Sequence, residues 1–216
     1  MKSNTLQSFL LLAIVVLSNS IFAQSTTKTK QAATTTKVVT AVKVVGINTE
    51  ASNIKWIGKK ILGQHNGQVK IQSGTLTIKN NAISGGEFTI DMKSITCDDL
   101  TDADYNKKMI GHLTSSDFFN VEAFPTATLK ITKVLKNTKI ANTYNFTANL
   151  TVKGITKSIT FPATFKKVGN VFEGNAKITL DRTKWDIKYG SSSFFEGLGD
   201  KAIKNEIELN VNIASN

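Results

Sequence analysis

Apolar and polar residues alternate strictly through most of this chain, from about residue 52 to its end. The pattern is clearest in Tyr144–Val152, where Tyr, Phe, Ala, Leu and Val take every second position and Asn and Thr stand between them. It recurs in Ile207–Ile213, where Glu and Asn separate the apolar residues. Because successive side chains of a β-strand point to opposite faces, this period of two predicts strands with one buried face. The chain is therefore expected to be all-β.

Short polar turns separate the predicted strands. Asn80–Asn81, Lys153–Gly154 and Gly169–Asn170 each stand between two alternating runs, as tight antiparallel hairpins require. About eight such runs can be counted, and no long amphipathic helix is available to cover a sheet. The apolar faces must then be buried against one another. This predicts a closed eight-stranded antiparallel barrel, although a β-sandwich fits the same periodicity.

Two longer segments interrupt the strands. The first runs from about Cys97 to Phe124, and in it four aspartates between positions 98 and 104 precede Met109. Since carboxylates favour the first turn of a helix, a short helical insertion is expected there. The second, Gly190–Asp200, contains three serines and is expected to be a loop over one end of the barrel.

The N-terminus has the features of a secretory signal peptide over residues 1–23. Lys2 is followed by an apolar run from Phe9 to Leu17 and by small residues ending at Ala23. The run is shorter than the about 20 apolar residues that span a bilayer. The sequence therefore predicts an exported protein, periplasmic or secreted.

Residues 24–46 are rich in Thr, Lys, Ala and Val and lack large aromatic residues, so they are expected to form a flexible linker before a β-barrel domain at 47–216. The chain has one cysteine, Cys97, and so no internal disulfide is expected. Stability must come from a packed core.

The basic charge does not indicate a nucleic-acid partner. There are 27 Lys and Arg against 16 Asp and Glu, but the lysines are scattered and Arg182 is the single arginine. Nucleic-acid readers usually cluster basic residues and use arginine forks. No nucleic-acid partner is expected, while an anionic membrane surface fits the positive charge.

We expect no metal ion, no other cofactor and no enzymatic activity. Two histidines and Cys97 stand in separate segments without the spacing of a zinc site. Cys97 directly precedes Asp98-Asp99, and these carboxylates disfavour the thiolate that a nucleophilic cysteine needs.

Three blocks of sequence carry a resemblance to a known family. They are Gly111–Pro125 (GHLTSSDFFNVEAFP), Asn149–Lys157 (NLTVKGITK) and Leu180–Ile187 (LDRTKWDI). Together with the earlier Gly63–Gly67 (GQHNG), they resemble the ordered motifs of the YceI-like family. The chain departs from the family at Lys107–Gly111, where an Arg-Asp pair often stands, so shared headgroup recognition at that position is not implied.

The resemblance implies a lipocalin-like antiparallel barrel that binds polyisoprenoid-type lipids, such as prenyl quinones or prenyl phosphates, in exported bacterial proteins. An apolar tunnel can bind such a tail without catalytic groups, because burial contributes about 25 cal/mol per Å². The aromatic residues next to the two interruptions, a histidine in the Gly-rich turn and two inward phenylalanines are the ligand-binding candidates. They are His65, Phe88, Phe118, Phe119, Phe124, Phe146, Trp185, Phe194 and Phe195.

Each candidate also has a purely structural interpretation. The rings beside the interruptions either gate an opening or plug the barrel ends, and His65 either bonds a headgroup or is a turn residue. The leading hypothesis is a protein that binds a long apolar lipid, such as a polyisoprenoid, prenyl quinone or similar amphiphile, for carriage, storage or sensing in the periplasm. The alternative is an exported structural or interaction module with a fully packed barrel. The oligomeric state is open, and a dimer is compatible with the sequence.

Overall fold

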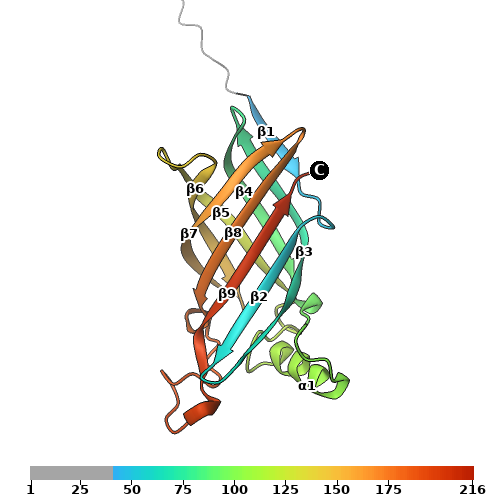
Figure 1. The fold of residues 1–216 in the computed structure, drawn as a ribbon, viewed down its shortest axis with the longest axis vertical. Helices are drawn as coiled ribbons and strands as arrows, with labels where there is room; N and C mark the ends of the chain where they lie inside the picture. The colour runs from blue at the N-terminus through green and yellow to red at the C-terminus, as the bar shows by residue number, and fades with distance from the viewer. Residues whose placement is uncertain (1–40) are drawn as a thin grey trace, which may run out of the picture. The chain divides into compact units, whose positions relative to one another are not determined.

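The computed structural model describes residues 41–216, so the expected signal peptide and most of the expected linker lie outside the described residues. Within this range nine strands form one antiparallel sheet that closes on itself, as Figure 1 shows. The strands are β1 (Val42–Gly46), β2 (Asn53–Lys60), β3 (Gln64–Lys79), β4 (Ala82–Asp91), β5 (Thr126–Lys136), β6 (Thr143–Val152), β7 (Ile155–Val168), β8 (Val171–Asp181) and β9 (Ile203–Ala214). Strands β2 to β9 complete the circle, because β2 pairs with β9 and β4 pairs with β3. The predicted closed eight-stranded barrel is confirmed.

Strands β1 and β2 pair with successive parts of β3 and together occupy one place in the barrel. One edge of β3 pairs first with β2 and then, at Thr75–Lys79, with β1. The prediction of a linker up to residue 46 is therefore wrong for its last five residues, 42–46, and the folded domain begins before residue 47. Composition did not reveal this strand because it buries only Val45 and depends on backbone pairing with a distant segment.

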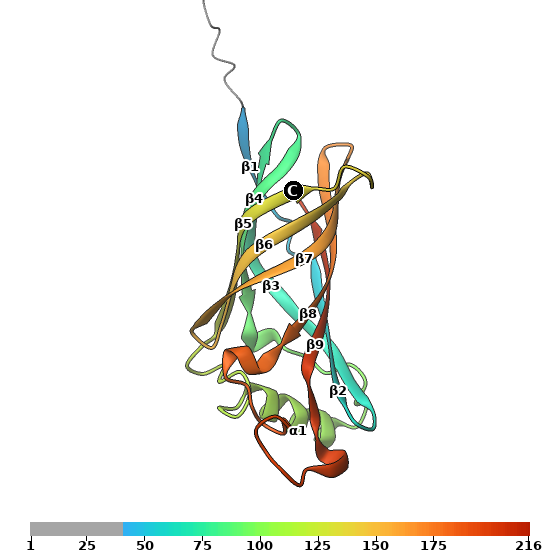
Figure 2. The same ribbon diagram turned by 90° about the vertical axis from the view of Figure 1, so that its left-hand side faces the viewer.

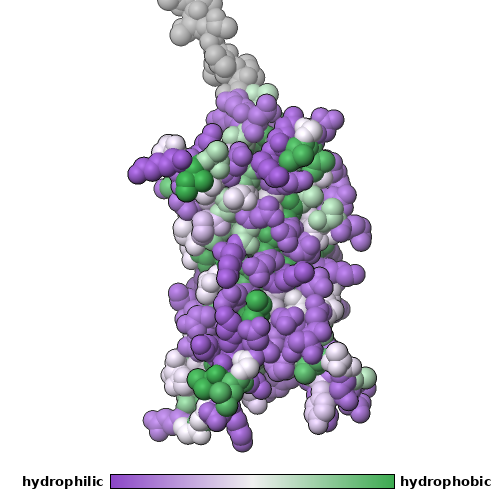
Figure 3. Space-filling model, in the orientation of Figure 1, coloured by the Kyte–Doolittle hydropathy of each residue, from purple (hydrophilic) through white to green (hydrophobic). Residues whose placement is uncertain are grey.

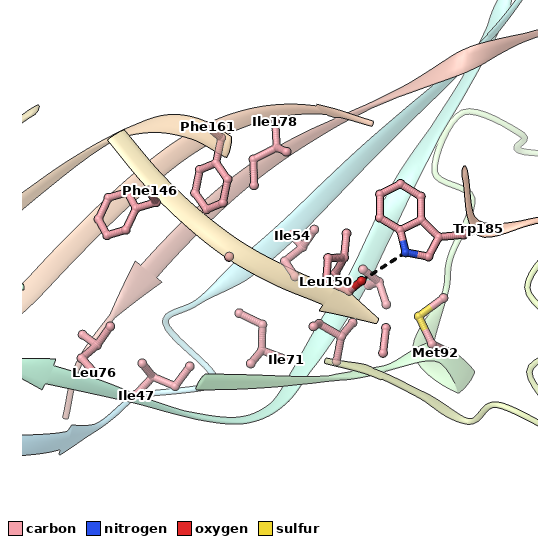
Figure 4. Packing of buried hydrophobic residues seen from close by; sticks show 14 of the residues in the cluster. Ile47, Ile54, Ile71, Leu76, Met92, Phe146, Leu150, Phe161, Ile178 and Trp185 are labelled. Carbon is pink, nitrogen blue, oxygen red and sulfur yellow. Dashed lines mark hydrogen bonds between the residues drawn. The ribbon is translucent and has the colours of Figure 1, made fainter. Parts of the chain in front are cut away.

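The alternation seen in the sequence separates the interior of the barrel from its surface. On β6, Tyr144, Phe146, Ala148 and Leu150 are buried inside. The ring of Phe146 stacks on Phe161 of β7 with centroids 5.8 Å apart, and both appear in Figure 4. Figure 3 shows that hydrophilic side chains dominate the outer face of β2, β8 and β9.

The segment between β4 and β5 covers one end of the barrel, here called the α1 end (Figure 2). It contains the 3-10 helix η1 (Met92–Ser94) and the helix α1 (Ala103–Thr114), which confirms the predicted helical insertion. The carboxylate of Asp102 accepts hydrogen bonds from the backbone N–H groups of Asp104 and Tyr105 at 3.0 Å and caps the helix. Among the described residues, no helix has the length and apolar character needed to cross a membrane.

Residues 94–99 run beside the first half of β3, where β4 no longer pairs with it. Thr96 N–H donates to the Gln68 carbonyl at 2.9 Å, and Asp98 N–H donates to the Asn66 carbonyl at 2.8 Å. The approach is so close that a Cβ atom on Gly67 would lie 1.9 Å from the carbonyl oxygen of Thr96. Glycine at position 67 therefore lets residues 94–99, here called the crossing segment, form hydrogen bonds with the backbone along the edge of β3.

Substituting Gly67→Ala should destabilise the barrel, because the backbone of Thr96 must move away from β3. We expect the free energy of unfolding to fall by about 2–3 kcal/mol in urea denaturation. The matched control is Gly111→Ala on α1, where a Cβ atom meets nothing within 4 Å. It should leave stability unchanged or raise it by up to about 1 kcal/mol. Equal, small effects of both substitutions would contradict the close approach.

Candidate functional site

The interior of the barrel contains an apolar cavity of about 260 Å³. Residues from all eight strands β2 to β9 line it, and its wall is apolar. Several inward side chains, such as Leu129, Ile159, Leu209 and Val211, are only half-buried because they face this space rather than a packed neighbour. The arrangement can hold an apolar chain.

Five of the predicted ligand-binding residues line the cavity: Phe88, Phe118, Phe119, Phe146 and Trp185. Trp185 ends the 3-10 helix η2 (Arg182–Trp185), which follows β8. Its indole N–H donates to the Leu150 carbonyl at 3.2 Å (Figure 4). This bond satisfies the polar atom of the ring while its apolar body faces the interior.

Three other candidates lie outside the cavity wall. The ring of Phe124 lies against the β6–β7 turn, where a Cβ atom on Gly154 would be 2.9 Å from it. Phe194 and Phe195 are each 49% exposed in the loop before β9. The Nζ atom of Lys188 lies 5.2 Å from the centroid of the Phe194 ring. Phe194 and Phe195 therefore do not line the cavity, whereas Trp185 does.

A second hollow of about 460 Å³ opens at the α1 end. We call it the mouth. It shares Trp56, Gly58, Leu113, Phe118 and Ile203 with the cavity, so the two spaces adjoin. The other lining residues are Lys59, Lys60, His65, Leu100, Tyr105, Lys108, Met109, His112 and Tyr189. The ninth candidate, His65, thus lies at the mouth.

His65 belongs to a hydrogen-bonded cluster with Asp99 and Cys97. Its Nδ1 atom lies 2.8 Å from the Asp99 carboxylate, which also accepts the Asn66 N–H at 2.8 Å. Cys97 Sγ lies 3.4 Å from the same carboxylate. Desolvation opposes ionisation of Asp99, but the bonds from Asn66 and His65 prevail and lower its pKa. Burial, together with the hydrogen bond to Asp99, raises the pKa of the Cys97 thiol, which leaves it a poor nucleophile at neutral pH.

The same three side chains offer a nitrogen, a sulfur and an oxygen within 4.8 Å of one another, the atom types that bind Zn²⁺. Sequence spacing missed this grouping, because β3 and the crossing segment meet only in the fold. Each of the three ligand atoms has a hydrogen-bond partner within the cluster, so its geometry is accounted for without an ion.

Arg182 anchors the wall between η2 and β9. It is 2% exposed, and its guanidinium donates to the carbonyls of Lys204, Ile187 and Ile203 at 2.7 to 3.1 Å. The guanidinium carbon lies 5.7 Å from the centroid of the Phe118 ring. Desolvation by burial lowers its pKa. The sequence showed that this arginine is the single one and that it belongs to the Leu180–Ile187 block, but it did not reveal these contacts.

His112 on α1 has an unsatisfied polar atom. Its Nε2 atom is buried and has no hydrogen-bond partner among the described residues. The ring packs edge-on against Phe118 and Tyr189, with centroids 4.8 and 4.4 Å away. The sequence did not reveal its place at the mouth, because Tyr189 comes from a segment far along the chain.

Substituting Arg182→Met should remove three donors and leave buried carbonyls unpaired. We expect a loss of about 3 kcal/mol or more in the free energy of unfolding by urea. Lys184→Met is the matched control, because Lys184 is an exposed residue of the same 3-10 helix. It should change stability by no more than about 0.5 kcal/mol. A stable Arg182→Met barrel would show that the three bonds do not anchor η2.

Substituting Asp99→Asn should lower stability in a pH-dependent way. Because the folded-state pKa of Asp99 lies below its ordinary value of 3.8, the ionised carboxylate stabilises the fold above that pH and this contribution is lost as the pH falls through the folded-state pKa. We expect the variant to lose about 1 kcal/mol at pH 7. The deficit should shrink below pH 3.8. The exposed Asp117→Asn serves as control, and a deficit that stays constant with pH would contradict the assignment.

Comparisons with known proteins agree with this architecture. The family model for the YceI-like domain matches residues 45–215. UPF0312 proteins of Pseudomonas paraeruginosa and Yersinia enterocolitica are each 34% identical, over 116 and 114 residues that cover 50% and 44% of this chain. The matched stretch covers 56% of the length of each of these relatives.

Two solved structures share the fold. Burkholderia cenocepacia BcnA matches with a TM-score of 0.63 and 19% identity, covering 79% of this chain and 99% of that one. A polyisoprenoid binding domain from Saccharophagus degradans matches with a TM-score of 0.56 and 10% identity, covering 80% and 98%. The family model, which spans the whole barrel, is decisive, and the chain belongs to the YceI-like family.

Proposed function

We propose that the barrel binds the apolar tail of a long lipid, a polyisoprenoid, prenyl quinone or similar amphiphile. The observation that supports this most is the apolar cavity of about 260 Å³ inside a closed ladder of strands. Transfer of apolar surface from water into such a cavity is favourable by about 25 cal/mol per Å². The alternative, a structural or interaction module, requires a fully packed barrel, and such a barrel leaves no cavity of this kind.

The polar groups give the lipid a direction. The cavity wall is apolar, whereas lysine, histidine and tyrosine side chains gather at the mouth. The tail therefore lies inside and the polar end lies at the α1 end. The Saccharophagus degradans domain, described as polyisoprenoid binding, supports the ligand class through its fold.

We assign binding rather than catalysis, with carriage, storage or sensing in the periplasm as the role. The raised pKa of Cys97 supports this assignment, because it disfavours a thiolate nucleophile. The expected export is part of the same proposal.

Native mass spectrometry of the barrel, purified without detergent and followed by solvent extraction, tests the proposal directly. We expect one lipid per chain, either co-purified or taken up from added geranylgeraniol. A protein that carries no lipid and takes up none of the added alcohol would favour the interaction module.

Filling the cavity should abolish binding without unfolding the barrel. Ala163 on β7 faces the cavity beside Ala176 on β8, so Ala163→Phe places a ring where the tail would lie. We expect at least about tenfold weaker uptake of geranylgeraniol, with stability changed by less than about 1.5 kcal/mol.

The matched control is Thr179→Phe, which adds the same ring on the exposed outer face of β8. It should bind geranylgeraniol as the unsubstituted barrel does. Unchanged uptake by Ala163→Phe would place the lipid outside the cavity.

A further inference from the structure

We propose that His65, Cys97 and Asp99 form a binding site for one Zn²⁺ ion, which fastens the crossing segment to β3 beside the mouth. His65 lies on β3 and lines the mouth, whereas Cys97 and Asp99 lie in the crossing segment. The site binds a metal ion rather than the tail of a lipid, so the inference does not depend on the proposed function.

The first observation is the convergence of the three side chains. One nitrogen, one sulfur and one oxygen atom lie within 4.8 Å of one another. The Nδ1 atom of His65 is 2.8 Å from the Asp99 carboxylate, and Cys97 Sγ is 3.4 Å from it. Ligand atoms around a tetrahedral Zn²⁺ lie about 3.3–3.8 Å apart, since the Zn–N and Zn–S bonds measure about 2.0 and 2.3 Å. Small movements of these side chains therefore suffice for coordination.

The second observation is the chemistry of the three atoms. The whole chain contains two histidines and one cysteine, and two of these three residues meet at one carboxylate. A thiol is a weak hydrogen-bond donor, and a hydroxyl group would bond Asp99 more strongly than Cys97 does. Hydrogen bonding alone thus gives no reason for sulfur at this position. A set of nitrogen, sulfur and oxygen suits Zn²⁺ and disfavours Mg²⁺ and Ca²⁺, which take oxygen ligands.

The third observation is the support that holds the crossing segment in place. The side-chain amide of Asn106 on α1 donates to the Cys97 carbonyl at 2.7 Å. The N–H group of Asn66, the neighbour of His65 on β3, donates to the Asp99 carboxylate at 2.8 Å. Such surrounding contacts orient metal ligands. The side chains of His65 and Asp99 are 25% and 27% exposed, which gives an ion access from solvent.

Binding of the ion involves proton transfer and no change of oxidation state. The S–H bond of Cys97 breaks as the Zn–S bond forms, and its proton leaves to water. Coordination deprotonates a thiol even where, as here, burial raises its pKa. The His65 ring carries its proton on Nε2, which frees Nδ1 for the ion. Because the group in residues 41–216 has three side chains, a water molecule takes the fourth position of the tetrahedron.

Titrations with Co²⁺ and Zn²⁺ test the site on protein that has been freed of metal and kept reduced. Co²⁺ bound to a thiolate gives a charge-transfer band in the near ultraviolet, and we expect this band to saturate at one Co²⁺ per chain. Zn²⁺ should displace Co²⁺ and abolish the band. Zn²⁺ at about 100 times its Kd should raise the Tm by about 5–10 °C, whereas Mg²⁺ at the same concentration should not.

Substitutions locate the ligands. Cys97→Ser replaces sulfur by oxygen and keeps a donor to Asp99, so it should lose the charge-transfer band and bind Zn²⁺ at least about 100-fold more weakly. Asp99→Asn should weaken Zn²⁺ binding at least about tenfold. The matched control is Asp98→Asn, the same change on the neighbouring exposed carboxylate, which is outside the group of three. It should keep the Kd within about threefold.

The outcomes decide the proposal. A band that saturates at one equivalent, is absent in Cys97→Ser and persists in Asp98→Asn supports it. Absence of both the band and the Zn²⁺-dependent rise in Tm overturns it, as does a rise in Tm that persists in Cys97→Ser. Equal weakening by Asp98→Asn and Asp99→Asn attributes binding to the negative charge of the segment and also overturns the site. If circular dichroism shows that Cys97→Ser does not fold, His65→Gln applies the same criterion to the nitrogen ligand.

Discussion

Closure of the sheet through β3 is the constraint on which the rest of this structure depends. An open sheet leaves unpaired N–H and C=O groups along two edges, and β3 removes both by pairing with β4 on one side and with β2 and β1 on the other. β3 extends beyond the end of β4, so its first residues need another partner. Residues 94–99 provide it, and they bring Cys97 and Asp99 to His65. The mouth therefore forms where the regular ladder ends.

The same closure explains why an apolar cavity persists. Strand number and tilt set the width of a barrel, so the wall cannot collapse onto missing side-chain volume as loosely packed helices can. The small residues Ala127, Ala163 and Ala176 on neighbouring or nearby strands leave space that larger side chains elsewhere in the wall do not fill. Backbone hydrogen bonds hold the wall, and the cavity leaves the barrel without the stabilisation that a packed interior would give.

Periodicity predicted what depends on local pattern, and the fold decided what depends on distant contacts. The alternation of β6 predicted that Phe146 faces inward, and the helix-favouring aspartates predicted α1. Phe194 and Phe195 follow Trp185 closely in sequence, yet both are exposed in the loop before β9 and do not line the cavity. His112 and Tyr189 meet only because the β4–β5 and β8–β9 connections cover the same end of the barrel, which no single segment reveals.

Exposed apolar side chains do not by themselves identify the end through which a lipid enters. Exposed Leu62 and Phe195 belong to the β2–β3 and β8–β9 connections, which lie at the α1 end, whereas exposed Leu135 and Val168 lie where β5 and β7 end, at the other. Polar groups mark the α1 end of the cavity, since the adjoining hollow is lined by three lysines and by His112 with its unsatisfied Nε2 atom. An amphiphile that entered tail first from the α1 end would bury its apolar part and leave its polar part among these groups. Entry in the reverse direction would carry a solvated headgroup through an apolar wall, at the cost of its hydration.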